Sequence, residues 1–299
     1  MESGERAKKL IAIVGPTAVG KTAVAIELAK RLNTEIISAD SRQIFTELAI
    51  GTAKPSKEEL LRVTHHFINI KSITETYDAG QYGREAFELT IKLFERYDTL
   101  VLCGGSGLYI RSLLEGFDKM PDVPPDLRDR IVEQYRSKGL EWLQVEVEKA
   151  DSEYFKEVDV KNPQRLMRAL ELNWSSGQTM GALRKRETKQ LPFQVIKVGL
   201  ELPREELYQR IDSRMDQMIE NGLFAEAEKF YPQKELNALQ TVGYQEIFDF
   251  MEGMYDRVEA IRLLKRNSRR YAKRQLTWFK KDKDILWIRP EEMVFQFIN

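Results

Sequence analysis

A glycine-containing octapeptide, Gly15–Thr22, joins an apolar run to a helical pattern near the start of the chain. The run is Leu10–Val14 and the helical pattern is Ala23–Arg31. In such a loop the backbone N–H groups turn toward an anion, and the helix N-terminus adds partial positive charge. Lys21 supplies a point charge, and the Thr22 hydroxyl can hold Mg²⁺. The sequence therefore predicts a strand–loop–helix unit that binds pyrophosphate, with a plain glycine-rich turn as the alternative. The residues expected to hold the phosphates are Gly15, Pro16, Thr17, Ala18, Val19, Gly20, Lys21 and Thr22.

Further apolar, β-branched runs are separated by helical patterns, which is typical of a parallel sheet with covering helices. We therefore expect an α/β fold whose core is a P-loop, nucleotide-kinase-like parallel sheet. Helix periodicity also covers Arg204–Phe230 and Asp256–Lys280. The expected further strands are Glu35–Ala39, Thr99–Cys103, Val195–Leu200 and, as a candidate final strand, Asp284–Ile288.

The segment before the strand at Val195 differs in character. Three prolines at 121, 124 and 125 interrupt a loop, and helical patterns without strands follow at Asp126–Lys149 and Asn162–Trp174. We interpret residues 118–194 as an inserted helical domain, and residues 1–117 with 195–299 as the catalytic core. Within the insertion, Gly177–Pro192 is rich in Lys, Arg, Gln and Gly and predicts an exposed, mobile return.

Composition excludes several classes of protein. No stretch approaches the roughly 20 uncharged apolar residues that cross a bilayer, and the N-terminus lacks the apolar segment of an export signal. The one cysteine, Cys103, forbids an internal disulfide and a thiolate-rich zinc site, and we expect it to be a buried strand residue. The adjacent His65 and His66 point apart on most backbones and have no third ligand nearby, which favours a structural role. We expect a cytoplasmic protein without membrane association.

The chain has 47 basic and 47 acidic residues, but its positive charge is concentrated near the C-terminus. Residues 265–283 contain nine basic residues and one acid, Asp282, which gives nine minus one, a net charge of plus eight. Tyr271, Trp278 and Phe279 are interleaved with the basic residues. This pattern suits the phosphates and splayed bases of RNA. A solvated helix face whose aromatic residues face the core explains it equally well.

An acid closes the second expected strand, in the block Asp40–Gln43. The third strand instead ends in Gly104–Gly107, without the acid that nucleoside triphosphatases normally place there for Mg²⁺. Ligands collect beyond the carboxyl ends of parallel strands, so Asp40 should project toward the phosphate loop. It can act as a metal ligand or a general base, and a structural N-cap of the next helix is the alternative.

Seven ordered blocks resemble those of the tRNA dimethylallyltransferases of bacterial type, and together they span nearly the whole chain. The blocks are Gly15–Thr22, Asp40–Gln43, Gly51–Pro55, Gly104–Tyr109, Asn162–Glu171, Val242–Tyr244 and Lys273–Trp278. The resemblance implies transfer of a dimethylallyl group from dimethylallyl diphosphate to N6 of the adenosine 3′-adjacent to the tRNA anticodon, releasing pyrophosphate. It further implies Mg²⁺ as the cofactor, the tRNA anticodon stem-loop as a partner, and a monomeric enzyme.

The resemblance also gives chemical roles to residues near the phosphate loop. Charge on the departing pyrophosphate can be stabilised by Lys21, by Thr22 through Mg²⁺, and by a helix-borne arginine. The family motif favours Arg214 for that arginine; Arg210 shares its helical face, and a solvated helix charge is the alternative for both. In the family the counterpart of Asp40 is assigned as the general base for the weakly nucleophilic adenine amine.

Two further expectations concern residues that touch the substrates. Ser106 replaces the threonine common in the family and keeps its hydroxyl for substrate contact, and Lys54 should help to hold the donor. A base in an anticodon loop must be extruded into a pocket, so we expect a cavity spanning the two domains, with tRNA and donor entering from opposite sides.

The same resemblance implies a set of tRNA-binding residues. Leu166 and Met167 could instead pack in the protein core. Arg165 and Arg168 are suited to contacts with the tRNA backbone or bases. The expected tRNA-binding residues are Asp40, Ser41, Arg42, Gln43, Ser106, Arg128, Gln164, Arg165, Leu166, Met167, Arg168, Lys273, Arg274 and Gln275.

Two other functions are compatible with parts of this pattern. A small-molecule kinase would bind ATP in the same loop and use Asp40 as a base or metal ligand. A non-catalytic RNA-binding module would leave Lys21 and Thr22 without a purpose. Productive use of ATP rather than dimethylallyl diphosphate would identify a kinase.

Overall fold

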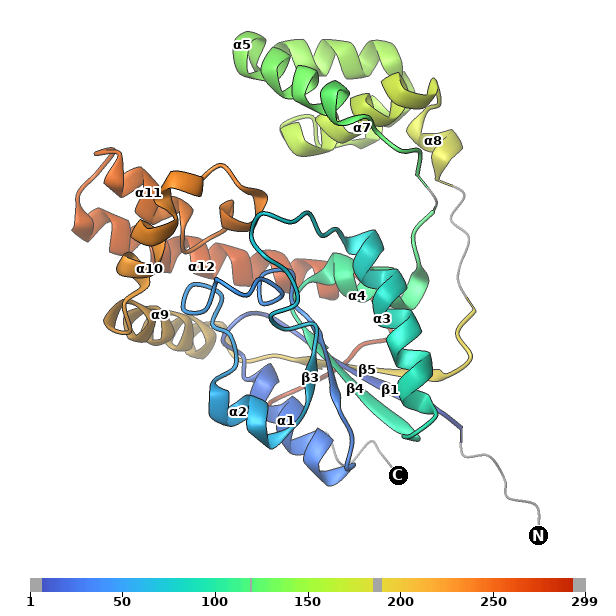
Figure 1. Ribbon diagram of the computed structural model, residues 1–299, viewed down its shortest axis with the longest axis vertical. Coiled ribbons are helices and arrows are strands. Elements are labelled where there is room, and N and C mark those ends of the chain that lie inside the picture. The colour runs from blue at the N-terminus through green and yellow to red at the C-terminus, as the bar shows by residue number, and fades with distance from the viewer. Residues whose placement is uncertain (1–6, 119, 185–189, 293–299) are drawn as a thin grey trace. The chain divides into compact units, whose positions relative to one another are not determined.

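One six-stranded parallel sheet forms the centre of the fold (Figure 1). The structure is a computed structural model that describes residues 7–118, 120–184 and 190–292. The strands lie in the order β3-β2-β4-β1-β5-β6, so the first apolar run is interior. The α/β fold class is confirmed, and each of the five predicted strands is present. The strands are β1 (Lys9–Val14), β2 (Ile36–Ala39), β3 (His65–His66), β4 (Thr99–Gly104), β5 (Gln194–Leu200) and β6 (Leu286–Ile288).

The sheet is covered on both faces, as the alternation along β1 shows. Leu10 and Ala12 belong to a hydrophobic cluster shared with α3 and α4, whereas Ile11 and Ile13 belong to a second cluster shared with α1 and α9. Successive side chains of a strand point to opposite faces, so both faces of β1 are buried and its sequence is continuously apolar. The helices of this core are α1 (Lys21–Arg31), α2 (Lys57–Arg62), α3 (Ala79–Phe94), α4 (Gly107–Glu115), α9 (Arg204–Glu220), α10 (Leu223–Phe230), α11 (Gln245–Met251) and α12 (Arg257–Phe279), with 3₁₀ turns η1 (Tyr231–Gln233) and η2 (Asn237–Leu239).

The structure differs from the sequence-based expectation at two places in this core. Strand β3 was not predicted, because its two histidines form no apolar run. Both histidines have structural partners, since His65 Nδ1 lies 2.8 Å from the Val63 carbonyl oxygen and His66 Nε2 lies 2.6 Å from Glu35 Oε2. The helical pattern at 204–230 is also interrupted, because Gly222 adopts φ +98° between α9 and α10, a conformation that glycine adopts without steric cost.

Residues Gly116–Lys189 form a second compact unit, whose described residues form helices and no strand. The sequence places the insertion at 118–194. Its core is an apolar cluster that includes Leu127, Leu143 and Leu170. The predicted helix at 126–149 is present but interrupted, since Gly139 has φ +76°. The helices of this unit are α5 (Pro125–Ala150), α6 (Ser152–Glu157), α7 (Pro163–Ser176) and α8 (Met180–Leu183).

Most described residues of the expected exposed return at 177–192 are exposed, but helix α8 anchors part of it. Met180 and Leu183 are buried in the helical unit, because the Asp151 carboxylate accepts a hydrogen bond of 2.6 Å from the Met180 amide and ties the segment to that unit. Residues 185–189 of the expected return lie outside the described residues.

A search of the described residues for a helix with the length and hydropathy needed to cross a membrane finds none.

Candidate active site at the phosphate loop

The register of three neighbouring strands brings the predicted site residues together. Val14 of β1 pairs with Gly104 of β4, and Gly104 pairs in turn with Ala39 of β2. The next residues along the chain, Gly15 and Asp40, therefore emerge at the same carboxyl edge of the sheet. This is the edge at which ligands bind in open parallel sheets. Asp40 and the phosphate loop thus face one site although β4 lies between their strands.

The same packing explains why β4 carries no acid at its end. A Cβ atom at Gly104 would overlap the Ala39 carbonyl oxygen, and one at Gly105 would overlap the side-chain amide of Gln275. The neighbouring backbone leaves no space for a side chain at Gly104, and one at Gly105 would displace the Gln275 amide. The acidic group of the site therefore comes from the strand beside β4, as Asp40.

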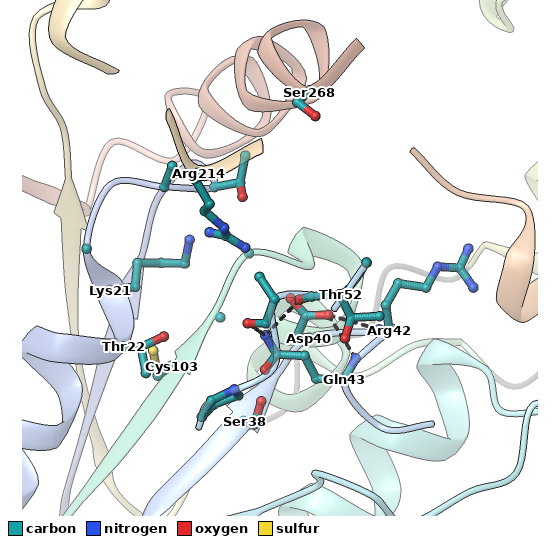
Figure 2. A pocket seen from close by; sticks show the side chains of 18 of the residues that line it. Lys21, Thr22, Ser38, Asp40, Arg42, Gln43, Thr52, Cys103, Arg214 and Ser268 are labelled. Atoms are coloured by element: carbon teal, nitrogen blue, oxygen red, sulfur yellow. Dashed lines mark hydrogen bonds between the residues drawn. The ribbon is translucent and has the colours of Figure 1, made fainter. Parts of the chain in front are cut away.

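A cavity of about 440 Å³ lies over this edge (Figure 2). All the residues that line it belong to the core unit, and most of them come from the phosphate loop, the Asp40 turn, the loop at 51–53, the end of β4, α9 and α12. The predicted site residues that line it are Thr17, Ala18, Gly20, Lys21, Thr22, Asp40, Arg42, Gln43, Arg214 and Gln275.

Several residues of the cavity were not predicted as site residues. Apolar side chains on α9, including Met215 and Met218, and the half-buried Tyr271 of α12 line it. Cys103, expected only as a buried strand residue, also lines it. Burial raises the pKa of the Cys103 thiol to about 11, so the thiol is protonated at neutral pH and is no nucleophile.

Lys21 is folded back onto the phosphate loop. Its ammonium donates hydrogen bonds to the carbonyl oxygens of Gly15 (3.0 Å) and Pro16 (2.7 Å). Burial lowers the pKa of Lys21 from 10.5 to about 8; the neighbouring Cys103 and Asp40 act in the opposite direction. The ammonium is therefore mostly charged at neutral pH and loses its charge as the pH rises through about 8.

Asp40 uses one carboxylate oxygen to hold the backbone that follows it. Its Oδ1 accepts hydrogen bonds from the amides of Arg42 (2.9 Å) and Gln43 (3.2 Å). The alternative role considered for Asp40 is a structural N-cap. Asp40 does cap the backbone that follows it, but it caps a turn rather than a helix. No hydrogen bond joins Oδ2 to any residue that the structure describes. One oxygen of a cavity-lining carboxylate is therefore available to a ligand.

The two arginines of α9 differ in their partners although both line the cavity. Arg210 Nη2 lies 2.9 Å from Glu206 Oε1 and 3.5 Å from Glu291 Oε1, so two carboxylates balance its charge. Arg214 has neither a hydrogen bond nor an ion pair with the described residues. Burial lowers the pKa of Arg214 and Asp40 raises it. In Figure 2 Arg214 and Lys21 extend toward the same part of the cavity, so Arg214 is the arginine available to an anion.

Gln275 does not have the exposed position expected of a tRNA contact. It is 7% exposed, its Oε1 accepts from the Thr17 amide at 2.8 Å, and its Nε2 donates to the Gly105 carbonyl oxygen at 2.9 Å. The side chain therefore braces the phosphate loop against the end of β4. One consequence is that the Thr17 amide is already occupied, so fewer loop amides are available to phosphate.

We expect Gln275→Leu to lower the free energy of unfolding by about 1–3 kcal/mol, because it leaves the Thr17 amide and the Gly105 carbonyl oxygen without partners. Urea denaturation of both proteins measures the difference. Lys273→Ala, an exposed change on the same helix, is the control and should alter the free energy by less than about 0.5 kcal/mol. Equal stability of Gln275→Leu and wild type would contradict the bracing role.

Ser106 and Ser41 support the Asp40 turn. Ser106 Oγ accepts from the Ser41 amide at 2.9 Å and donates to Ser41 Oγ at 3.2 Å, and Ser106 is not among the residues that line the cavity. Arg42 Nη1 donates to the Asn237 carbonyl oxygen at 2.9 Å. The turn that follows Asp40 is thus held by hydrogen bonds to Ser106 and Asn237, which both belong to the core unit.

Other predicted donor-binding residues lie outside the cavity. The Lys54 ammonium donates to the Phe45 carbonyl oxygen (2.7 Å) and to Asn69 Oδ1 (2.6 Å), and Lys54 does not line the cavity. Val19 is fully buried in the hydrophobic core, and Gly15 and Pro16 contribute the carbonyl oxygens that hold Lys21. The loop that contains Lys54 reaches the cavity through residues 51–53 and through Pro55 instead.

The residues predicted to bind tRNA in the helical unit fall into two groups. Leu166 and Met167 are 0% and 6% exposed and pack in that unit's core, whereas Gln164 and Arg165 are exposed. Glu171, which is 2% exposed, pairs with two of the predicted arginines. The ion pairs of Glu171 are to Arg128 (3.6 Å) and Arg168 (3.2 Å).

The side chains of helix α12 and of its basic residues differ in their surroundings. Phe279 is buried in the core and Trp278 packs against it, whereas Tyr271 lines the cavity and Lys273 and Arg274 are exposed. Three of the basic residues are neutralised by acids of other elements. These ion pairs are Lys265–Asp216, Arg269–Asp212 and Lys280–Glu201, each at 2.6 Å.

The oxygen donors at the cavity fit a magnesium ion that also binds a phosphate. Within the described ranges, no group of three or more His, Cys, Asp or Glu side chains could hold a metal by itself. The Thr22 hydroxyl is a hard oxygen donor beside the phosphate loop, and the Asp40 carboxylate lines the same cavity. Mg²⁺ typically takes few protein ligands and completes its octahedron with water and substrate phosphates.

Known proteins resemble the chain along nearly its whole length. The family model described as IPP transferase matches residues 43–282. A tRNA dimethylallyltransferase of Cytophaga hutchinsonii is 50% identical over 286 residues, which cover 96% of this chain and 94% of that protein. The structure of a tRNA isopentenylpyrophosphate transferase from Bacillus halodurans matches with a TM-score of 0.69 at 38% identity, covering 94% of this chain and 89% of that one.

A structure of a eukaryotic dimethylallyltransferase acting on tRNA matches with a TM-score of 0.77 at 24% identity, and it supports the fold alone. It covers 97% of this chain and 77% of that one. The sequence resemblance is thus confirmed by a family model, by relatives and by solved structures, and the chain belongs to the IPP transferase family.

Proposed function

We propose that this enzyme transfers a dimethylallyl group from dimethylallyl diphosphate to N6 of the adenosine 3′-adjacent to the tRNA anticodon, releasing pyrophosphate. The proposal depends on one observation, that a carboxylate and an arginine lie in one cavity over the phosphate loop. Among the described residues, one oxygen of the carboxylate has no hydrogen bond and the arginine has no ion pair. The two residues are Asp40 and Arg214. Together they supply a proton acceptor and an anion-stabilising group.

The leaving-group side of the reaction lies at the phosphate loop. When the allylic carbon–oxygen bond of the donor breaks, negative charge accumulates on the pyrophosphate. Lys21 and Arg214 face this position and stabilise the charge as it develops. A Mg²⁺ ion held by the Thr22 hydroxyl and the diphosphate would neutralise further charge on the leaving group.

The acceptor side lies at Asp40. The adenine N6 amine is a weak nucleophile, because its lone pair is delocalised into the ring. As N6 forms its bond to the allylic carbon, it loses a proton, and Asp40 Oδ2 is the oxygen free to accept that proton. The hydrogen bonds to Oδ1 hold the carboxylate in one orientation meanwhile.

The anticodon stem-loop is the proposed second partner. The exposed Gln164 and Arg165 of the helical unit and the exposed Lys273 and Arg274 of α12 are suited to its phosphates and bases. The target adenosine must leave the stack of the loop to reach a cavity of this kind. We further propose that the enzyme acts in the cytoplasm as a monomer.

The kinase alternative is not favoured. The relatives are named tRNA dimethylallyltransferases, and β4 has no space for the acid that nucleoside triphosphatases place there. The phosphate loop is equally suited to the diphosphate of a prenyl donor, because its amides and lysine recognise phosphate oxygens only.

The decisive experiment incubates the protein with unmodified tRNA, Mg²⁺ and labelled dimethylallyl diphosphate and then digests the tRNA to nucleosides. We expect the label in a modified adenosine, and no label when the target adenosine is replaced by guanosine. ATP in place of the prenyl donor should give no product. Label that persists after the guanosine replacement would exclude the proposed acceptor.

The pKa of Lys21 predicts an alkaline limit to activity. In the free enzyme the ammonium loses its proton as the pH rises through about 8, and only the charged form attracts a diphosphate, so kcat/KM for the donor should fall above that pH. Rates measured from about pH 6 to about pH 10 test this. Lys21→Arg is the control, because arginine stays charged over the range and should abolish the limit. If kcat/KM falls at the same alkaline pH in both proteins, a group other than Lys21 causes the fall.

A further inference from the structure

Glu226, on α10, holds a loop of the cavity wall although it does not itself line the cavity. Its Oε2 accepts from the amides of Ala49 (3.1 Å) and Ile50 (2.9 Å), and its Oε1 accepts from the amide of Gly51 (2.8 Å). The Tyr244 hydroxyl donates to the same Oε1 at 2.6 Å. Consecutive amides that converge on one anion form a nest, so the shape of this loop depends on the carboxylate.

The loop that Glu226 holds is tightly constrained on its other side. A Cβ atom at Gly51 would lie 2.5 Å from the Tyr244 ring, so only glycine allows this approach. Burial, and then the bond to Glu226, raises the pKa of Tyr244 far above its usual value, so the hydroxyl keeps the proton that it donates. Two residues further on, Ala53 has φ +46°, a conformation that a residue with a side chain rarely adopts.

A second set of hydrogen bonds connects this loop to Asp40. The side-chain amide of Gln43 donates to the carbonyl oxygens of Thr52 (3.3 Å) and Ala53 (3.1 Å). The backbone amide of the same Gln43 donates to Asp40 Oδ1 at 3.2 Å. The orientation of the Asp40 carboxylate and the position of the loop are therefore coupled through a single residue.

We infer that Glu226 is a positioning residue that fixes the loop at 49–53 and, through Gln43, the orientation of the Asp40 carboxylate. The effect of Glu226 on the rate of prenyl transfer rests on the proposed function, because it assumes that Asp40 acts as the base. The anchoring of the loop by the carboxylate does not depend on that function. The two parts can therefore be measured separately.

The first measurement follows hydrogen exchange of the backbone amides at 49–51 in wild type and in Glu226→Gln. An amide side chain places an NH₂ group where a second acceptor oxygen is needed, so we expect these amides to exchange at least about tenfold faster in the variant. Glu228→Gln is the matched control, since Glu228 is exposed on the same helix and its side chain has no hydrogen bond within the described residues. Unchanged exchange at 49–51 in Glu226→Gln would overturn the inference.

The second measurement is the single-turnover rate of prenyl transfer, normalised to folded enzyme. We expect Glu226→Gln to lower it by about 10- to 100-fold, Tyr244→Phe by less, and Glu228→Gln not at all. Glu226→Asp keeps the charge and should restore part of the rate. A rate for Glu226→Gln within about twofold of wild type would refute the positioning role.

Two outcomes separate this inference from the proposed function. If the wild-type protein transfers no prenyl group, the proposed function fails, and the exchange experiment still decides whether Glu226 anchors the loop. If Glu226→Gln does not fold, Tyr244→Phe replaces it, because it removes one of the four hydrogen bonds to the carboxylate. Unchanged exchange and rate in Tyr244→Phe would then count against the inference.

Discussion

Replacing Asp40 by asparagine should lower the single-turnover rate of prenyl transfer by about 10²- to 10⁴-fold and leave binding of the donor nearly unchanged. The amide oxygen of asparagine can still accept the hydrogen bonds from the amides of Arg42 and Gln43, so the turn should keep its conformation. The NH₂ group that takes the place of Oδ2 cannot accept a proton. Rapid-quench measurement of labelled tRNA gives the rate, and equilibrium titration gives donor affinity.

Asp256→Asn is a suitable control for this substitution. Asp256 caps α12 through the amide of Glu259 at 2.8 Å, so the same chemical change is made at a similar backbone hydrogen bond away from the cavity. It should leave the rate unchanged. A single-turnover rate of Asp40→Asn equal to wild type would remove Asp40 from the mechanism.

The second large effect is expected at Arg214. Arg214→Gln should lower kcat by about 10²- to 10³-fold, because it removes a charge that stabilises the departing pyrophosphate in a partly desolvated site. Arg210→Gln, one helical turn away, removes an arginine whose charge Glu206 and Glu291 already balance, and it should change kcat by less than about threefold.

Product inhibition by pyrophosphate distinguishes the two arginines independently of the chemical step. Arg214→Gln should weaken pyrophosphate binding, whereas Arg210→Gln should not. Thermal melts of both variants control for unfolding. Equal losses of kcat in the two variants would show that the helix charge as a whole, rather than Arg214, acts on the leaving group.

Much of the fold follows from local sequence patterns. Buried parallel strands are continuously apolar, so β1, β2, β4, β5 and β6 are visible as runs, and the octapeptide identifies the phosphate loop in its strand-to-helix setting. The rule that ligands gather at the carboxyl edge correctly places Asp40 beside that loop. The two-residue strand β3 and the break at Gly222 are too short to leave a periodic pattern.

The finer assignments in the site depend on contacts that no local pattern contains. Gln275 braces Thr17 across 258 positions of the sequence, and Glu226 holds Ile50 across 176 positions. Arg210 and Arg214 lie on the same face of one helix, so the sequence pattern does not separate them. They differ in their ion pairs, and one partner of Arg210, Glu291, lies in a different segment of the chain. Such partners become visible only when the chain is folded.

The crowding at the end of β4 also limits how this enzyme can evolve. A carboxylate at position 104 would require β2 and β4 to separate at the Ala39 carbonyl, which would break the register that aligns Asp40 with the phosphate loop. A single substitution therefore cannot install an acidic metal ligand there. A nucleotide hydrolase built on this scaffold would therefore have to take its acidic metal ligand from a neighbouring strand, as Asp40 follows β2 here.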